Sequence, residues 1–257
     1  MYNMKKKVLG IIPSRYASTR FPGKPLVKIN GVSMIQRVYE QCMKSHLLTH
    51  VLVATDDKRI KKHVQSFGGN VVMTSPDHQS GTDRCLEAYK LFCSNNPDYI
   101  PDVIVNIQGD EPLIDPKDID LLSAAFSDKS VKIATLATPF SDSKQVEGYN
   151  SVKIVCNSRG KALYFSRSVI PFFRNKAPVP QLFLKHIGIY AFQTKTLERI
   201  CKLSVSALEN AESLEQLRWL ENGVDIKVLV TQNDGLCVDV PEDVKNIEHF
   251  LIKNCLK

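Results

Sequence analysis

Three cations stand close together near the start of the chain: Arg15, Arg20 and Lys24. They surround a Pro-Gly turn between an apolar run at residues 7–12 and a helix start at Ser33. A loop that follows the first parallel strand is where open α/β sheets bind ligands, and its cations favour an anion such as the phosphates of a nucleotide. The segment is neither a Walker phosphate loop nor a dinucleotide fingerprint. Residue types alone therefore leave a solvated surface loop as an equal alternative.

Two aspartates are candidate ligands for a metal ion. Asp110 follows the most β-branched run of the chain, at residues 103–107, and Asp239 stands two residues before Pro241. Magnesium prefers oxygen ligands, often one or two carboxylates plus substrate phosphates. The two aspartates would form such a site if the sheet brought them together. Each also has a plain structural alternative, a turn residue for Asp110 and a favourable charge at a helix start for Asp239.

Further polar candidates lie elsewhere. The segment Asp77–Arg84 opens a helix with Ser80 at its N-cap, and a helix start offers free N–H groups to an anion or a base edge. In the second half of the chain, the candidates flank strands or lie beside the apolar stripe of a predicted helix. For Glu215, the structural alternative to a binding role is an i,i+3 surface pair with Arg218. No histidine or cysteine spacing suggests zinc, and no nucleophile elbow occurs. These later candidates are Arg167, Lys185, His186, Tyr190, Glu215 and Gln216.

Short apolar runs alternate with helical patterns in the first half of the chain, which predicts right-handed βαβ units and a mainly parallel sheet flanked by helices. After residue 131 strand patterns dominate, so residues 139–185 are predicted to be an insertion of antiparallel strands, with a loop at Asn175–Gln181. The predicted strands are 7–12, 51–55, 70–73, 103–107, 131–138, 151–156, 162–166, 187–192 and 226–230. The predicted helices are 57–67, 80–93, 206–221 and 241–253, with further helices starting at Ser33 and at Asp115-Pro116.

The overall composition is that of a globular protein. The 257 residues suffice for one large α/β domain with an insertion, and 43% hydrophobic and 24% charged residues are ordinary values. The net charge of +7 could indicate nucleic-acid binding, but the cations are spread along the chain and no such motif occurs. Seven cysteines without a C-x-x-C pair suggest reduced thiols in the cytoplasm. No apolar run reaches the roughly 20 residues of a membrane span. We expect neither nucleic acid nor a membrane as a partner.

Seven blocks, in this order along the chain, resemble the 3-deoxy-manno-octulosonate cytidylyltransferase (CMP-Kdo synthetase) family nearly end to end. Related cytidylyltransferases share mainly the first block, so the later blocks are the specific ones. The blocks are Ile12–Leu26, Asp77–Arg84, Asn106–Pro112, Ala162–Arg167, Lys185–Tyr190, Leu214–Arg218 and Val238–Asp243.

The resemblance implies a cytoplasmic, magnesium-dependent homodimer with the fold of nucleotide-diphospho-sugar transferases. It implies that the enzyme makes CMP-Kdo and pyrophosphate from CTP and the acidic sugar 3-deoxy-D-manno-octulosonate (Kdo), for lipopolysaccharide biosynthesis. Residues 139–205 would be a sugar-binding and dimerisation subregion within a single domain spanning 1–257.

The resemblance also assigns roles to residues. The catalytic residues would be Lys24, Arg15, Asp110 and Asp239, the last two as magnesium ligands. The nucleotide would contact Arg15, Arg20, Lys24, Asp77, Ser80, Thr82 and Asp110. The Kdo side would be lined by Gln108, Arg167, His186, Tyr190, Glu215 and Gln216, with Arg167 first and His186 second as partner of the sugar carboxylate.

Three alternatives stay open at this point. The first block alone permits cytidylyl transfer to another acidic sugar such as a sialic acid. The basic surface permits a non-catalytic nucleotide- or RNA-binding protein, whose affinity would depend steeply on salt. A glycosyltransferase of related fold is the third alternative, although no Asp-x-Asp sequence follows the central strand to support it.

Overall fold

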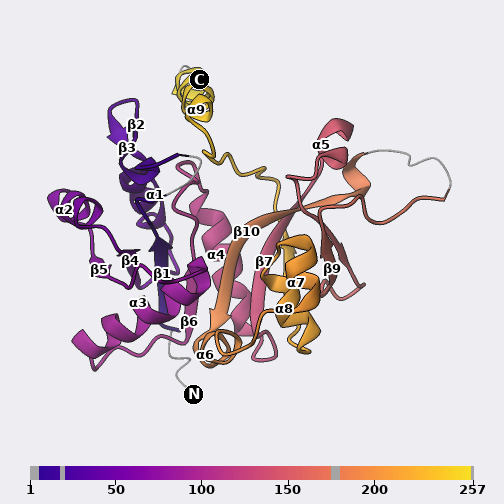
Figure 1. Ribbon diagram of the computed structural model, residues 1–257, viewed down its shortest axis with the longest axis horizontal. Helices are drawn as coiled ribbons and strands as arrows, with labels where there is room; N and C mark the ends of the chain where they lie inside the picture. Colours follow the sequence, from indigo (N-terminus) through magenta and orange to yellow (C-terminus); the bar gives the residue numbers. More distant parts are fainter. Residues whose placement is uncertain (1–5, 18–20, 175–179, 256–257) are drawn as a thin grey trace. The chain divides into compact units, whose positions relative to one another are not determined.

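The computed structural model describes residues 6–17, 21–174 and 180–255 (Figure 1). Arg20 and residues 175–179 of the predicted loop lie outside the described residues. The chain groups into two compact units: unit 1 comprises residues 1–120 and 235–257, and unit 2 comprises residues 121–234. The predicted insertion at 139–205 falls within unit 2.

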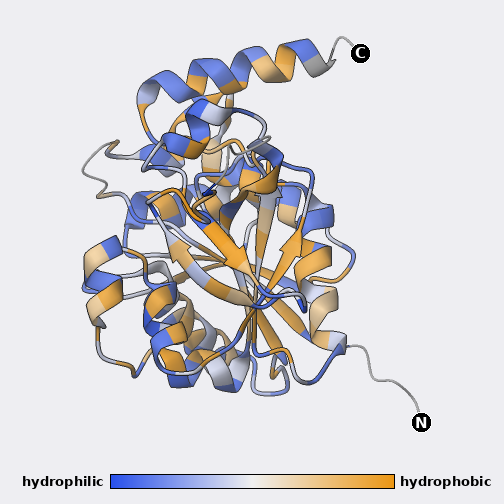
Figure 2. Ribbon diagram, turned by 90° about the vertical axis from the view of Figure 1, so that its right-hand side faces the viewer, coloured by the Kyte–Doolittle hydropathy of each residue, from blue (hydrophilic) through white to orange (hydrophobic). Residues whose placement is uncertain are grey.

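Unit 1 is built on a parallel sheet with the strand order β6-β1-β4-β5. All residues of β1 except its last are buried, as are all residues of β6, and the strands visible in Figure 2 are mostly hydrophobic. Such continuous apolar runs are typical of parallel strands that are covered on both faces. The strands are β1 (Val8–Pro13), β4 (His50–Thr55), β5 (Val71–Met73) and β6 (Val103–Asn106).

The helices of unit 1 begin where the capping signals predict. Ser33, Asp57 and Ser80 each accept a backbone N–H of the first turn that follows. Ser33 Oγ accepts the Gln36 N–H, but no full capping box forms there, because the Gln36 side chain donates to Glu40 Oε1. The helices are α1 (Met34–Cys42), α2 (Lys58–Ser66), α3 (Gly81–Asn95) and α9 (Pro241–Cys255), and α4 (Pro116–Ala124) crosses the boundary between the units.

A short 3-10 turn, η1 (Lys24–Leu26), and a small hairpin of β2 (Lys28–Ile29) and β3 (Val32–Ser33) link β1 to α1. The hairpin was not predicted from the sequence. Its Asn30-Gly31 turn has φ values of 46° and 80°, the left-handed conformation that two-residue hairpins require. The η1 turn carries Lys24 into the site.

Unit 2 combines a parallel pair, β11 with β7, with antiparallel pairing of β7 with β10, β10 with β8 and β8 with β9. Trp219 packs edge-on against Tyr190 and Phe192 in its core. The strands are β7 (Ile133–Pro139), β8 (Lys153–Cys156), β9 (Ala162–Ser166), β10 (Leu184–Gln193) and β11 (Ile226–Val230). The helical segments are η2 (Ala125–Ser127), α5 (Ser143–Glu147), η3 (Pro180–Leu182), α6 (Thr194–Ile200), α7 (Ala207–Glu212) and α8 (Gln216–Glu221).

The single helix predicted at 206–221 is wrong, because the structure divides it into α7 and α8. Ser213 ends α7 in the left-handed conformation, with φ 51°. Arg218 pairs with Glu209 of α7, at 2.6 Å between Nη2 and Oε1.

The predicted fold class is confirmed: a mainly parallel sheet flanked by helices, with a smaller antiparallel β region. No helix within the described ranges combines the length and hydropathy needed to cross a bilayer.

Candidate functional site

A cleft of about 260 Å³ opens in unit 1 where β1 and β6 end and α3 begins. This is the edge at which open α/β sheets bind ligands. Most of its lining is polar or backbone rather than aliphatic. The described lining residues are Pro13, Ser14, Arg15, Lys24, Pro25, His78, Gln79, Ser80, Gly81, Arg84, Gln108, Gly109 and Asp110.

The Lys24 ammonium joins both predicted carboxylates. Its Nζ lies 2.6 Å from Asp110 Oδ2 and 3.9 Å from Asp239 Oδ1, and donates to the Val238 carbonyl at 2.8 Å. The Val238 N–H in turn donates to the Asp110 carbonyl at 2.9 Å. Three segments that are far apart in the sequence thus meet at one cation.

Asp239 stands two residues before α9, where a negative charge also favours the helix start. Asp243, in the first turn of α9, accepts the N–H groups of Asp239 and Val240 through Oδ2. The Asp239 carboxylate is oriented toward Lys24 and stays 42% exposed. Asp243 thus supplies the hydrogen bonds at the start of α9, while the Asp239 carboxylate lies near Lys24.

Gly109 allows the end of β6 to approach the end of β1. A Cβ atom at residue 109 would lie 2.9 Å from the Pro13 carbonyl oxygen and 2.9 Å from Ser14 Oγ. The Pro13 carbonyl belongs to the backbone and cannot move away cheaply, so only glycine fits without a shift of these two loops.

We expect Gly109→Ala to lower turnover by about tenfold or more, because the added methyl group displaces Arg15 and Asp110 from each other by a fraction of an ångström. Steady-state kinetics together with the thermal unfolding midpoint would measure this. Gly148→Ala is the matched control, since its φ of −66° suits alanine and a Cβ there meets no atom closer than 3.4 Å. Unchanged turnover in Gly109→Ala would contradict the close approach.

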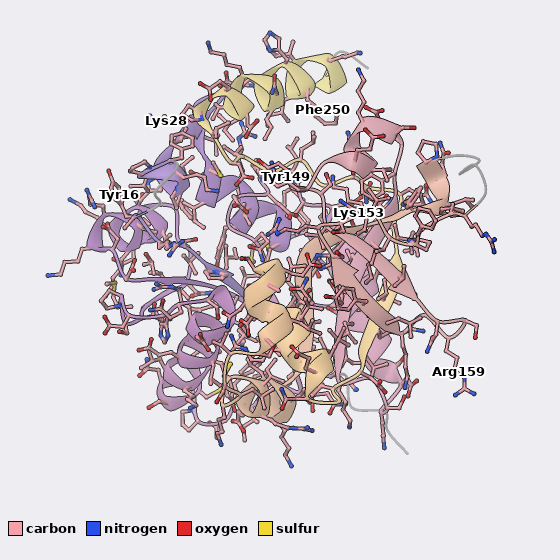
Figure 3. All side chains as sticks on the ribbon, turned by 45° about the vertical axis from the view of Figure 1, so that its right-hand side comes forward. Tyr16, Lys28, Tyr149, Lys153, Arg159 and Phe250 are labelled. Atoms are coloured by element: carbon pink, nitrogen blue, oxygen red, sulfur yellow. The ribbon has the colours of Figure 1, made fainter. Side chains whose placement is uncertain are left out.

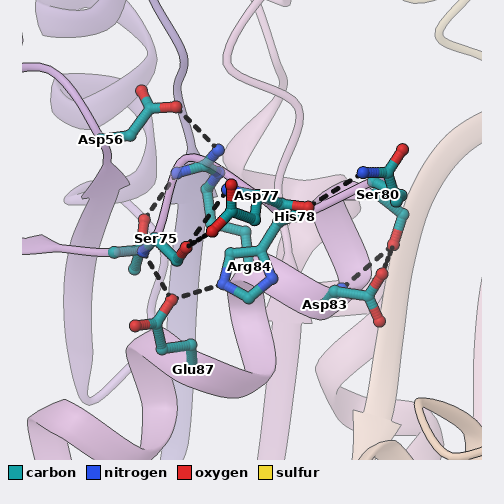
Figure 4. A network of polar contacts seen from close by, with 10 residues as sticks. Asp56, Ser75, Asp77, His78, Ser80, Asp83, Arg84 and Glu87 are labelled. Atoms are coloured by element: carbon teal, nitrogen blue, oxygen red, sulfur yellow. Dashed lines mark hydrogen bonds and ion pairs between the residues drawn. The ribbon is translucent and has the colours of Figure 1, made fainter.

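Arg84 ties three loops of the cleft together (Figure 4). It is 3% exposed and donates to Thr74 Oγ1 at 2.6 Å and to Asp56 Oδ2 at 3.1 Å. Thr74 and Asp56 follow β5 and β4, whereas Arg84 lies in the first turn of α3. The buried guanidinium thus fixes the start of α3 relative to the strand ends.

His78 lines the cleft and is held from behind by Glu87 of α3, through Nε2 and Oε2. Burial raises the pKa of Glu87, but hydrogen bonds from His78 and from the Ser75 N–H outweigh it and hold the pKa below its usual value. Glu87 therefore acts as a carboxylate that orients the His78 imidazole at the cleft.

The cleft brings together four of the seven residues predicted for the nucleotide: Arg15, Lys24, Ser80 and Asp110. Of the others, Asp77 is exposed and accepts from Ser75, Thr82 is buried, and neither is among the described lining residues. Gln108, predicted for the sugar, also lines this cleft. His78 and Arg84 were not predicted as site residues, although both stand in the block Asp77–Arg84.

The sugar residues predicted in unit 2 lie around β9, β10 and the α7–α8 turn. Two of them bury polar atoms, Tyr190 Oη and Gln216 Nε2, that find no hydrogen-bond partner among the described residues. Thr135 lies close enough to influence the pKa of Tyr190, but no hydrogen bond of acceptable geometry joins them. Burial first, and then the Glu215 charge, raise the pKa of Tyr190, so its hydroxyl stays protonated.

His186 is uncharged near neutral pH. Protein atoms surround the imidazole on most sides, with Phe165 edge-on and Thr135 Oγ1 3.1 Å from Nε2. This desolvation lowers its pKa to about 3. His186 is therefore suited to hydrogen bonding and not to pairing as a cation with a sugar carboxylate.

Because the ordinary pKa of histidine is about 6.5, the unfolded chain binds a proton here between about pH 6.5 and 3 while the folded chain does not. Stability should therefore fall as the pH drops through this range, by up to about 1.4 kcal/mol per pH unit. Urea unfolding at several pH values would measure the slope. His186→Gln should flatten it and the exposed His249→Gln should not. Equal slopes in His186→Gln and the wild type would refute the assignment.

Comparison with known proteins agrees with this geometry. The cytidylyltransferase family matches residues 9–226. A 3-deoxy-manno-octulosonate cytidylyltransferase of Parabacteroides distasonis is 52% identical, over 95% of this chain and 98% of that protein. An 8-amino-3,8-dideoxy-manno-octulosonate cytidylyltransferase of a Shewanella species is 46% identical, over 95% of this chain and 98% of that one.

The solved structures include a CMP:2-keto-3-deoxy-manno-octonic acid synthetase in complex with CTP. It is 40% identical, superposes with a TM-score of 0.88, and the match covers 96% of this chain and 99% of that one. The family resemblance expected from the seven blocks is thereby confirmed. The chain belongs to the cytidylyltransferase family and, within it, to the 3-deoxy-manno-octulosonate cytidylyltransferases, which are nucleotidyltransferases.

Proposed function

We propose that this protein transfers CMP from CTP to the anomeric hydroxyl of Kdo, giving CMP-Kdo and pyrophosphate for lipopolysaccharide biosynthesis. The observation that carries the proposal is the convergence of Asp110 and Asp239 on the Lys24 ammonium, beside a polar cleft at the strand ends. Relatives of about half-identical sequence bear the name of this activity.

The nucleotide would occupy the cleft of unit 1. Arg15 and Lys24 supply positive charge for the phosphates. Ser80 and Gly81 at the start of α3 line the same space, and the free backbone N–H groups of a helix start suit an anion or the acceptor edge of a base. We assign the cytidine to this end and the triphosphate to the end near Lys24.

Magnesium fits the carboxylate pair. A single cation, the Lys24 ammonium, already lies between Asp110, Asp239 and the Val238 carbonyl, all oxygen donors of the type that magnesium prefers. No cluster of three or more histidine, cysteine or carboxylate ligands occurs in the part of the chain that the structure describes. Asp110 and Asp239 would therefore hold the metal with phosphate oxygens completing its shell. A bound magnesium would neutralise phosphate charge and lower the pKa of the attacking hydroxyl.

Unit 2 would supply the sugar-binding residues. The unpartnered Tyr190 Oη and Gln216 Nε2 are suited to sugar hydroxyl groups, because a buried polar atom without a partner is costly unless a ligand satisfies it. Arg167 donates to backbone carbonyls, at 2.8 Å to Glu212 and 3.2 Å to Tyr149, and neither neutralises its charge. We assign the sugar carboxylate to Arg167.

The reaction needs no protein nucleophile. The anomeric oxygen forms a bond to the α-phosphorus, the bond from that phosphorus to the β-phosphate oxygen breaks, and the hydroxyl proton passes to solvent. Such transfers depend on positioning and on stabilisation of charge. Lys24 and Arg15 would stabilise the negative charge that grows on the α-phosphate and on the leaving pyrophosphate.

Pyrophosphate release tests the proposal. Each of the four nucleoside triphosphates would be incubated with Kdo, with 8-amino-3,8-dideoxy-manno-octulosonate, with a sialic acid or with no acceptor, with and without magnesium. We expect release only with CTP, Kdo and magnesium together. Preference for the 8-amino sugar or the sialic acid would move the substrate to that acceptor, and release without any acceptor would overturn the proposal.

We also propose that the protein acts as a homodimer, as the family resemblance implies. Sedimentation equilibrium at micromolar concentration would measure its mass. A species of about 29 kDa, the mass of one chain, would contradict a dimer, whereas twice that mass would support it.

A further inference from the structure

A buried lysine in unit 2 plays no part in the mechanism above. Lys153, the first residue of β8, is fully buried. Its Nζ donates to three backbone carbonyls, at 2.9 Å to Gly148, 2.8 Å to Ser151 and 2.6 Å to Arg167. A buried ammonium is expensive unless every donor is used, and here each of the three protons has an acceptor. Figure 3 shows Lys153 beside Tyr149. Tyr149 belongs to the turn at residues 148–151, whose Gly148 and Ser151 carbonyls Lys153 holds.

Glu212, the last residue of α7, also holds the chain at Arg167, directly after the end of β9. Its Oε2 accepts the Arg167 N–H at 2.9 Å, and its Oε1 accepts from Ser166 Oγ at 2.6 Å. Charge-assisted hydrogen bonds of this kind are about twice as strong as neutral ones. Lys153 and Glu212 thus fix the backbone of Arg167 on both its N–H and its C=O.

The Arg167 side chain then connects two further segments. Nε donates to the Glu212 carbonyl at 2.8 Å, Nη2 reaches the Ser213 carbonyl at 3.5 Å, and Nη1 donates to Tyr149 O at 3.2 Å. The first two acceptors are carbonyls at the end of α7, which have no partner within the helix itself. Arg167 therefore stabilises the left-handed turn at Ser213 that leads directly into Glu215 and Gln216.

We propose that Lys153 and Glu212 are positioning residues for the acidic sugar: they hold Arg167, and through it the start of α8, in the geometry that binds the sugar carboxylate and hydroxyl groups. This rests on the proposed function, in which Arg167 pairs with the carboxylate of Kdo.

The charges of the cluster agree with an anionic ligand. Lys153 and Arg167 contribute two positive charges and Glu212 one negative charge, and the remaining partners named above are neutral. The hydrogen-bonded cluster thus carries a net charge of +1, which one sugar carboxylate would balance. Burial lowers the pKa of Lys153, while the nearby Glu212 raises it and Arg167 lowers it further. Loss of Glu212 would leave two cations facing each other.

The test compares KM for CTP and KM for Kdo in the single variants Glu212→Gln and Lys153→Met. Arg167→Ala and the double variant Arg167→Ala/Glu212→Gln are measured in the same way. We expect Glu212→Gln to raise KM for Kdo by about tenfold or more, because the guanidinium is displaced, with KM for CTP within about twofold of wild type. Lys153→Met should show the same split with a lower thermal midpoint, since it removes the ammonium that donates to three carbonyls. Lys161→Met, which removes an exposed lysine of unit 2 paired with Asp225, is the matched control and should change neither KM.

A merely structural role would reduce the active fraction, and so kcat, without changing the ratio of the two KM values. Glu212→Gln should add less than about twofold to the effect of Arg167→Ala, because residues that act through one another are not additive. Unchanged KM ratios in both single variants, or fully additive effects in the double variant, would overturn the inference while leaving the proposed function intact. Failure of the wild type to use Kdo would overturn both.

Discussion

Lys24→Met should lower kcat for pyrophosphate release by at least about a hundredfold, which corresponds to roughly 2.7 kcal/mol of transition-state stabilisation. Methionine keeps the length and apolar stem of lysine but removes the ammonium that lies 2.6 Å from Asp110 Oδ2. The lost interaction is stronger in the transition state than in the ground state, because charge moves onto the leaving pyrophosphate. The effect should therefore fall on kcat more than on KM for CTP.

The Lys24 variant also changes the unliganded site. Asp110 and Asp239 would lose the cation that now lies between them, so their like charges would repel each other without compensation. Magnesium binding at neutral pH should persist in Lys24→Met, because a divalent cation can replace the ammonium between the carboxylates.

Calorimetric titration with magnesium and steady-state kinetics at saturating magnesium would check these two expectations. Lys28→Met, which removes an exposed lysine of the same unit (Figure 3), is the matched control. Near-normal turnover of Lys24→Met at saturating CTP and magnesium would exclude Lys24 from the chemistry.

The part of the site formed by strand ends could be predicted from the sequence. The β-branched run before Asp110 and the apolar run before Arg15 identify buried parallel strands, and parallel strands carry their functional loops at one edge. Ser80 could be placed at a helix start because N-capping is a local signal. That Asp239 lies near Asp110 and Lys24 could only be stated as a hypothesis, since 129 positions separate the two aspartates along the chain.

Unit 2 was harder to predict because its local pattern conflicts with its contacts. Leu208, Leu214 and Leu217 repeat with helical periodicity, and this pattern predicts one continuous helix. The structure breaks the helix at Ser213, where Arg167 takes the two carbonyls at the end of α7. An interaction with a strand almost 50 residues earlier overrides the helical period, and no pattern within the segment reveals it. The same holds for Lys153, whose sequence position gives no sign that three carbonyls enclose it.

The second large effect concerns the metal. Asp239→Asn should raise the magnesium concentration for half-maximal activity by about tenfold or more and lower turnover at physiological magnesium roughly a hundredfold. Asparagine keeps the shape of the side chain but loses the charge that a hard cation requires. Its partly exposed position, 42% of the side chain, means that the substitution costs the fold little. Glu242→Gln, an exposed carboxylate in the first turn of α9, is the control and should behave as wild type.

The magnesium titration also separates two roles that the geometry alone would allow for Asp239. If the carboxylate served only to hold Lys24, the defect of Asp239→Asn would be the same at every magnesium concentration and would resemble that of Lys24→Met. If it binds the metal, high magnesium should restore a large part of the activity in Asp239→Asn and none in Lys24→Met, because mass action can compensate for weakened metal binding but not for a missing ammonium. Unchanged magnesium dependence in Asp239→Asn would refute the two-carboxylate site.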